Sequence, residues 1–318
     1  MASPLTVLPP RGRQTQETRY LTQDRPKKRN ISGWLILDKP FDMTSTQAVG
    51  KVRWLFNAMK AGHAGTLDPL ATGILPIALG EATKAVAAVQ DGTKRYSFSI
   101  RWGIETTTDD AEGEIVSASD YRPSESEVRA ELPRFVGEIM QTPPIFSAIK
   151  VDGERAYDLA RAGEQVALAA RPVVIEQLDL VAHGPQESRF DMRCEKGTYV
   201  RSLARDLARA LGTRGHVSAL RRTQVGPFSE RDAVELSALE AAQPREDFLL
   251  PISAGLAEWP ELRIDAGQAS AIRNGNAVLL TGARAPVMLE IAWASAAGQP
   301  VAIGRVEAGR FQPQRVFV

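Results

Sequence analysis

The segment from Gly62 to Lys84 constrains this chain more than any other stretch of its 318 residues. It contains a single aspartate, Asp68, directly before Pro69, and a proline disfavours helical geometry in the residue that precedes it. Glycines, which permit tight bends and close approach, stand at positions 62, 65 and 73. The apolar run Ile74–Leu79 follows. The segment therefore predicts a loop that presents an acid, and not a helix that buries one.

Asp68 does not by itself identify a reaction. An Asp-Pro pair is most often an ordinary turn, in which the carboxylate is solvated or caps the backbone. Functional residues are nevertheless concentrated in loops, so a catalytic role stays open beside the structural one. The segment contains neither the phosphate-binding loop pattern nor the dinucleotide-binding glycine pattern.

Two further stretches show clear periodicity. From Tyr96 to Trp102 apolar and polar residues alternate, which predicts a strand with one apolar face. Tyr96 lies on that face, where it is either a core aromatic or a ring at the edge of a cleft. Over Val200–Leu211 leucines recur every four residues at 203, 207 and 211, and arginines do so at 201, 205 and 209. The offset of two residues is roughly 200° around a helix, so the two sets lie on nearly opposite sides. The arginine side is either a solvated charged face or, at Arg201, part of a site whose neighbours approach phosphates.

Composition excludes several classes of protein. The longest apolar runs fall short of the roughly 20 residues of a membrane-spanning helix. Cys194 is the single cysteine, so no internal disulfide is expected, and core packing is its default role. One cysteine and three histidines make a His/Cys metal cluster unfavourable. Residues 1–30 are basic and polar, which predicts a flexible tail.

The Asp68 segment closely resembles the signature of the TruB-type tRNA pseudouridine-55 synthases, and other blocks resemble that family in the same order. The resemblance covers about residues 31 to 230 and is carried by Gly33–Pro40, Gly62–Lys84, Lys94–Tyr96, Thr106–Gly113, Gln141–Lys150 and Lys196–Leu203. Several long matches in order are far more specific than one short motif.

The resemblance implies an α/β (α+β) pseudouridine synthase fold, with a mixed, largely antiparallel central sheet flanked by helices. It implies a catalytic domain over 31–250, an RNA-gripping insertion over about 144–172, and a small β-rich, PUA-like RNA-binding domain over 251–318. The family resemblance is much weaker in the last of these. Glycine-containing turns between short β-rich runs favour a small β module there independently.

The resemblance also implies roles for individual residues. Asp68 matches the nucleophile and Arg201 the arginine that pairs with it, since a guanidinium stays protonated and binds a carboxylate with two prongs. Tyr96 matches the tyrosine that stacks on the target base, with uptake of the C5 proton as a less secure second role because its ordinary pKa is near 10. The remaining matches are a second pocket tyrosine, an RNA-contacting histidine and two site-lining residues of structural or orienting role: Tyr199, His63, Lys84 and Asp110.

The expected activity is isomerisation of the T-loop uridine of tRNA at position 55, after the base is flipped out of the loop. The expectation includes no cofactor or metal, no obligatory protein partner, a monomer that binds the T-arm of tRNA, and a cytoplasmic location. Three alternatives remain: a guide-dependent rRNA pseudouridine synthase, a tRNA-binding folding factor, and a metal-dependent hydrolase that uses Asp109 and Asp110.

Overall fold

The computed structural model describes residues 27–147, 149–151, 153–162 and 167–318. Most of the tail expected over 1–30 and part of the expected insertion lie outside these ranges. The last residues of the tail are described, and they are held by the body of the protein. Arg29 exchanges backbone hydrogen bonds with Asn57 and Met59 and forms an ion pair with Glu246.

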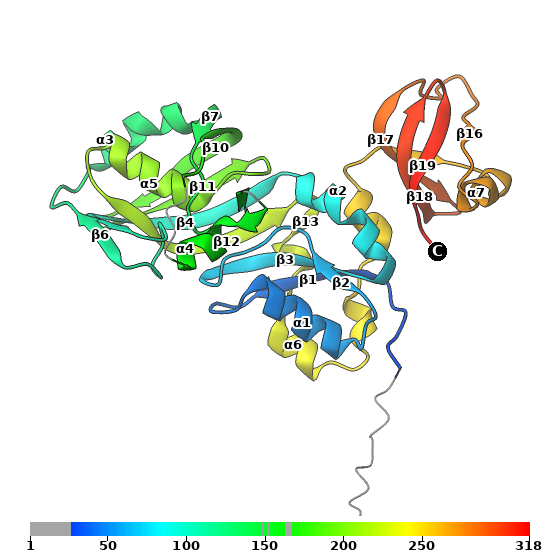
Figure 1. Cartoon of the computed structure of the whole chain (residues 1–318), viewed down its shortest axis with the longest axis horizontal. Helices are drawn as coiled ribbons and strands as arrows, with labels where there is room; N and C mark the ends of the chain where they lie inside the picture. Colours follow the sequence, from blue (N-terminus) through cyan, green and yellow to red (C-terminus); the bar gives the residue numbers. More distant parts are fainter. Residues whose placement is uncertain (1–26, 148, 152, 163–166) are drawn as a thin grey trace, which may run out of the picture.

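One large sheet organises the first 250 residues (Figure 1). Its main strand order is β14-β1-β3-β12-β4-β11-β10-β7, with β2 beside β3 and β13 beside β12. All pairs are antiparallel except β1 with β14 and β3 with β12. The strands are β1 Gly33–Lys39, β2 Ala61–His63, β3 Ala71–Leu79, β4 Lys94–Trp102, β7 Gly137–Gln141, β10 Arg171–His183, β11 Glu187–Cys194, β12 Gly215–Val225, β13 Phe228–Ser229 and β14 Val234–Glu235.

Short helices and ribbons complete this part of the chain. The α-helices are α1 Ser45–Leu55, α2 Val86–Asp91, α3 Glu125–Glu131, α4 Ala156–Arg161, α5 Val200–Ala210 and α6 Leu236–Ala241. The 3-10 helices are η1 Gly80–Ala85, η2 Leu132–Phe135, η3 Glu230–Asp232, η4 Arg245–Phe248 and η5 Ile252–Leu256. Two small ribbons pair β5 Ile104–Thr106 with β6 Ile115–Ala118, and β8 Lys150–Val151 with β9 Glu154–Arg155. No helix within the described ranges has the length and apolar character needed to cross a bilayer.

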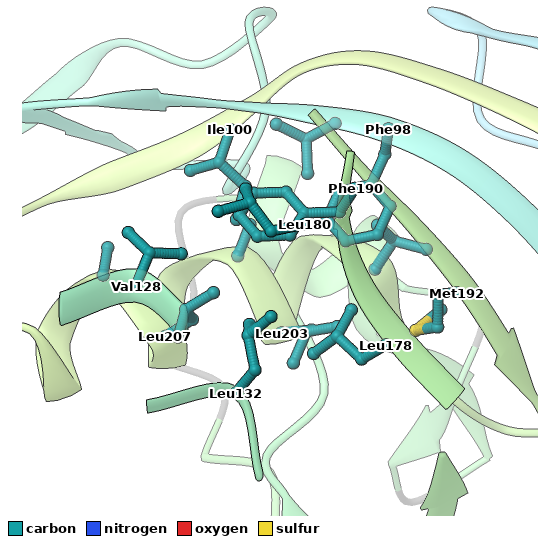
Figure 2. Packing of buried hydrophobic residues seen from close by; sticks show 14 of the residues in the cluster. Phe98, Ile100, Val128, Leu132, Leu178, Leu180, Phe190, Met192, Leu203 and Leu207 are labelled. Atoms are coloured by element: carbon teal, nitrogen blue, oxygen red, sulfur yellow. The ribbon is translucent and has the colours of Figure 1, made fainter. Parts of the chain in front are cut away.

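The α5 half of the sheet is held by one apolar core (Figure 2). Leu203 and Leu207 of α5 belong to one buried cluster with Phe98 and Phe190 on the neighbouring strands β4 and β11. Phe98 and Phe190 stack with their ring centres 5.4 Å apart. Cys194 is buried in the same core, where burial raises the pKa of its thiol to about 11, so the predicted packing role is confirmed.

Strand β1 is buried on both faces. It packs against α1 and α6 on one face and against the C-terminal unit on the other. Leu35 and Leu37 face a core shared with α1 and α6, whereas Trp34 and Ile36 face the opposite way. Trp34 packs in one cluster with residues of the C-terminal strands and donates its indole N–H to the carbonyl of Ile252. The C-terminal unit therefore packs, through apolar side chains, against the face of the sheet opposite α1 and α6.

The C-terminal unit is a separate curled sheet of five strands with its own core, drawn in orange and red in Figure 1. Its strands follow the order β15-β17-β18-β19-β16. The elements are β15 Glu261–Arg263, α7 Ala266–Arg273, β16 Val278–Leu279, β17 Leu289–Ala296, β18 Gln299–Glu307 and β19 Arg310–Val316. A mixed sheet flanked by helices and a small β-rich C-terminal domain confirm the predicted fold class. The helix α7 was not predicted.

A capping box starts α1, in which the Thr44 side chain accepts the backbone N–H of Gln47 and the Gln47 side chain accepts that of Thr44. The helix ends at Leu55, and Asn57, two residues later, adopts left-handed geometry with φ of 48°. That turn leads the chain back into β2 and the Asp68 loop.

Candidate active site

The Asp68 loop connects β2 to β3 and is held on both sides of the carboxylate. The hydroxyl of Ser45, at the start of α1, accepts the N–H of Leu67 at 2.8 Å and donates to its carbonyl at 2.9 Å. On the other side, the carbonyl of Pro69 accepts the ammonium of Lys39 at 3.0 Å. Buried groups therefore fix the residues on both sides of Asp68, and none of these hydrogen bonds uses the Asp68 carboxylate.

Lys39 is fully buried, and its ammonium binds the backbone of this part of the chain instead of solvent. Its ammonium donates to the carbonyls of Pro40, Met43 and Pro69. Burial lowers the pKa of Lys39 to about 8, against the opposing influence of Asp68. Three donated hydrogen bonds need the protonated form, which remains the major form at neutral pH. Lys39 was part of a family block, but the sequence analysis gave it no role.

Asp68 and Arg201 are in direct contact. The Oδ2 atom of Asp68 lies 2.8 Å from Nε of Arg201, and the aspartate side chain keeps 36% of its exposure whereas the arginine keeps 6%. The other nitrogens of Arg201 donate to the carbonyls of Thr108 and Phe146, both at 3.0 Å. A carboxylate oxygen of Asp110 lies 3.7 Å from Nε. Arg201 is thus fixed by four partners and presents Asp68 as an accessible, ion-paired carboxylate.

The two aspartates of the Thr106–Gly113 turn are both engaged. Asp110 accepts the hydroxyl of Thr108 at 2.5 Å and the N–H of Glu112 at 3.0 Å. Asp109 pairs with Arg205 at 2.9 Å, and burial raises the pKa of this carboxyl to about 6 despite the arginine. Across the described ranges, no three His, Cys, Asp or Glu side chains gather as metal ligands would. The geometry gives the hydrolase alternative no support.

Tyr96 lies on β4, between β11 and β12, and is half-buried at the margin of the α5 core. Its cross-strand partner on β12 is Arg222. Burial raises the pKa of Tyr96, and the nearby Arg222 acts in the opposite direction. The ring packs against the α5 core, as the core interpretation predicts, and its place at the edge of a cleft stays a prediction.

Tyr199 caps the N-terminus of α5 and is held through its backbone. Gln141 accepts its N–H at 2.8 Å and donates to its carbonyl at 3.1 Å. The guanidinium of Arg171 lies over the ring, 5.3 Å from its centre, and donates to the carbonyl of Gly197 at 3.1 Å. Tyr199 therefore connects α5 to the base of the expected insertion.

His63 precedes β3 in the sequence and Lys84 follows it. Of the two, only His63 lies close enough to Arg222 for that charge to affect it. The Nδ1 atom of His63 is buried without a hydrogen-bond partner within the described residues. Burial, and after it Arg222, lowers the pKa of this imidazole, so it is neutral at pH 7. Lys84 instead contacts Glu81 at 2.5 Å and the carbonyl of Val316 at 2.7 Å. Because β3 separates it from Asp68 by roughly 25 Å of strand, Lys84 belongs to the contact with the C-terminal unit and not to this group.

The arginines expected to approach phosphates are mostly neutralised inside the protein. Arg205 and Arg209 pair with Asp109 and Glu105, and the adjacent Arg221 holds Asp38 with two prongs at 2.8 and 3.0 Å. That the α5 arginines beside Arg201 approach phosphates stays a prediction. Their carboxylate partners come from distant segments, which helical periodicity does not show.

Arg222 is the main residue that the sequence analysis missed. It is 1% exposed and donates to the backbone beside Asp68 and in β3. Its neighbours in the sequence offer no signal of burial, because an arginine in an alternating strand looks the same whether it faces solvent or a core.

Comparison with known proteins gives consistent matches. The model of the N-terminal domain of TruB family pseudouridylate synthases matches residues 53–200, and that of the tRNA pseudouridylate synthase B C-terminal domain matches residues 201–256. The tRNA pseudouridine synthase B of Mesorhizobium japonicum is 51% identical, over 92% of this chain and 98% of that protein. The protein of the same name in Agrobacterium fabrum is 54% identical, over 92% and 96%.

Solved structures with the same fold include a chain from a Cbf5–Nop10–Gar1 complex. It superposes with a TM-score of 0.70 at 25% identity, covering 90% of this chain and 85% of that one. The family models together match well over half of the chain, and the relatives match it almost throughout. The chain therefore belongs to the TruB family of pseudouridylate synthases, and it is an enzyme of the isomerase class.

Proposed function

We propose that this protein isomerises the uridine at position 55, in the T-loop of tRNA, to pseudouridine. The reaction breaks the bond between N1 and the ribose C1′ and forms a bond from C5 to C1′, while the C5 proton leaves and N1 gains one. It needs a nucleophile, a pocket for the detached base and a proton acceptor. The relatives that carry the name tRNA pseudouridine synthase B, at about half identity, support tRNA as the substrate.

The contact between Asp68 and Arg201 is the observation that carries the proposal. A carboxylate in a closed site loses its charge unless a cation or hydrogen-bond donors favour the ionised form. Arg201 supplies that cation at 2.8 Å, and the remaining exposure of Asp68 leaves room for a nucleotide to approach. Asp68 then acts as a covalent nucleophile, as carboxylates do in glycosyl chemistry. Asp110, with a carboxylate oxygen 3.7 Å from the same Nε, helps to orient Arg201.

The aromatic residues serve the flipped base. Extrusion of a base costs a few kcal/mol, roughly offset by stacking on an aromatic ring and by backbone contacts. Tyr96 is assigned the stacking contact and the later acceptance of the C5 proton, and Tyr199 closes the pocket from the start of α5. His63, which is neutral at pH 7, is assigned a contact with the RNA that the base has left.

The remaining parts of the proposal concern assembly. The chain works as a monomer without a cofactor or an obligatory protein partner, and residues 31–250 form its catalytic unit. The C-terminal unit over 251–318 and the insertion over about 144–172 bind the T-arm.

The test uses unmodified tRNA and the purified chain alone. We expect pseudouridine at position 55 in the presence of the parent chain and none with Asp68→Asn, while tRNA affinity stays within about two-fold because a neutral isostere preserves shape. Asp247→Asn, an exposed aspartate of η4, is the matched control and should convert tRNA at the parent rate. Single-turnover conversion by Asp68→Asn near the parent rate would remove Asp68 from the mechanism.

A guide-dependent activity is the second candidate, because the fold also matches a chain of the Cbf5–Nop10–Gar1 complex. The same assay separates the two, since conversion of bare tRNA requires no guide. A folding role for the protein predicts that Asp68→Asn still promotes tRNA folding, measured by the rate at which the tRNA gains its native nuclease-protection pattern.

A further inference from the structure

Arg222 on β12 is a buried cation whose described hydrogen bonds to the main chain all end on the Asp68 segment. Its Nε donates to the carbonyl of Ile74 at 2.9 Å, Nη2 to Gly65 at 3.0 Å and Nη1 to Thr66 at 3.3 Å. Gly65 and Thr66 precede Asp68, and Ile74 follows it in β3. One planar guanidinium therefore joins the two ends of the loop that presents Asp68.

The strand register places Arg222 between the two sides of the site. Arg222 is opposite Gly73 of β3 on one side and opposite Tyr96 of β4 on the other. The positive charge of this guanidinium lowers the pKa of Tyr96, against the larger effect of burial, which raises it. Arg222 thus holds the loop of Asp68 and is the cross-strand partner of the residue assigned to the flipped base.

Holding a loop with a buried guanidinium costs desolvation free energy. Removing a charge from water costs several kcal/mol, roughly, even after the protein relaxes around it, and only well-formed hydrogen bonds offset this. A neutral amide could donate to one or two of these carbonyls. Only a guanidinium carries a rigid fork of five N–H donors that can reach three carbonyls at once.

We propose that Arg222 is a positioning residue that fixes Asp68 and Tyr96 relative to each other and acts on the chemical step, not on RNA affinity. The inference rests on the proposed roles of Asp68 and Tyr96. It predicts that the geometry of the fork matters more than its charge, because a displacement of about 1 Å at reacting atoms can cost on the order of 100-fold in rate.

The neighbouring Arg221 provides a matched control. It lies on the same strand, but its side chain is 36% exposed and pairs with Asp38 and Glu230, away from the Asp68 loop. We expect Arg222→Lys to lower the single-turnover rate on tRNA by on the order of 100-fold while tRNA affinity changes less than about two-fold. Arg221→Met should change the rate less than about three-fold.

The rate is compared at a temperature at which circular dichroism shows each variant fully folded. A rate for folded Arg222→Lys within about three-fold of the parent would overturn the proposal and leave Arg222 a structural residue. Arg222→Lys is also combined with Tyr96→Phe, and we expect the two losses to be strongly non-additive. Additive losses would contradict the joint positioning of Asp68 and Tyr96.

Hydrogen exchange supplies a readout that does not depend on catalysis. Amides of the Gly65–Ala71 loop should exchange at least about ten-fold faster in Arg222→Lys than in the parent, and unchanged in Arg221→Met, because the loop loses its clamp. If the parent chain fails to convert tRNA, the proposed function fails, yet this measurement still decides whether Arg222 holds the loop. Unchanged exchange in Arg222→Lys would refute the inference.

Discussion

The two sides of Asp68 use arginine in different ways. On the α5 side, Arg201, Arg205 and Arg209 each pair with at least one carboxylate. On the β12 side, Arg222 donates three hydrogen bonds to backbone carbonyls. A guanidinium that faces a carboxylate sets the charge of its partner, whereas one that faces carbonyls sets the position of the chain. The same residue type therefore controls ionisation on one side and shape on the other.

The α5 side is itself graded by burial. The side chains of Arg201, Arg205 and Arg209 are 6%, 10% and 52% exposed in that order along the helix. Buried pairs lose much more than exposed pairs when one partner is removed, because the remaining charge cannot be rehydrated. The stability lost on removing the cation should therefore be larger at Arg205 than at Arg209, and the second and third predictions test this. The first prediction tests Arg201 through the reaction rate, with the charge retained.

The largest effect is expected for Arg201→Lys. A lysine keeps the charge but cannot hold Asp68, Thr108 and Phe146 together, so the single-turnover rate on tRNA should fall on the order of 1,000-fold. Arg201→Lys should melt close to the parent, since the positive charge is retained. A rate within ten-fold of the parent would show that the positive charge at position 201, and not the geometry of the guanidinium, supports Asp68.

The second effect is a loss of stability in Arg205→Met. It leaves Asp109 without its cation and should cost about 3 kcal/mol near pH 8, measured by chemical denaturation. The loss should be smaller at pH 5. Burial raises the pKa of Asp109 from 3.8 to about 6, so the folded protein binds the extra proton between these values and its stability falls as the pH rises through them.

Removal of Arg205 raises that pKa further and extends the fall to higher pH, so parent and variant differ most above pH 6. The double variant Arg205→Met with Asp109→Asn is the control, because it has no carboxylate to titrate at 109. Its deficit should be independent of pH between 5 and 8. An equal deficit of Arg205→Met at pH 5 and pH 8 would mean that the Asp109 carboxylate is not what the pair stabilises.

The third effect, for Arg209→Met, should be small. Its pair with Glu105 is half exposed on the arginine side, so the expected cost is below about 1 kcal/mol and should shrink further in 0.5 M salt. Denaturation at low and high salt measures both. A cost equal to that of Arg205→Met would break the gradient along α5.

The smallest effect is expected for Lys84→Met, outside both sides of the site. Lys84 was assigned to the site by resemblance, but its contacts with Glu81 and Val316 tie η1 to the C-terminal unit. We expect tRNA conversion within about two-fold of the parent and a stability loss of about 0.5 kcal/mol. A selective loss of rate with unchanged stability would return Lys84 to the site.

The sequence predicted the elements of the site better than their surroundings. The Asp68 loop, the strand of Tyr96 and the helix of Arg201 all follow from local patterns of proline, glycine and hydrophobic spacing. The burial of the arginine side of α5 does not, because Asp109 and Glu105 arrive from about one hundred residues away. The burial of Arg222 could not be predicted either, because its acceptors are backbone carbonyls, which every residue carries.

Gly73 shows how far such long-range requirements extend. It has a φ of 95°, and a methyl group at this position would come within 2.2 Å of the carbonyl oxygen of Arg222 and 3.0 Å of its nitrogen. Both neighbours are main-chain atoms of a paired strand, so neither can move aside like the end of a flexible side chain. In a saturation mutagenesis screen Gly73 should tolerate no replacement and score like a reactive group, although it has no side chain with which to touch a nucleotide.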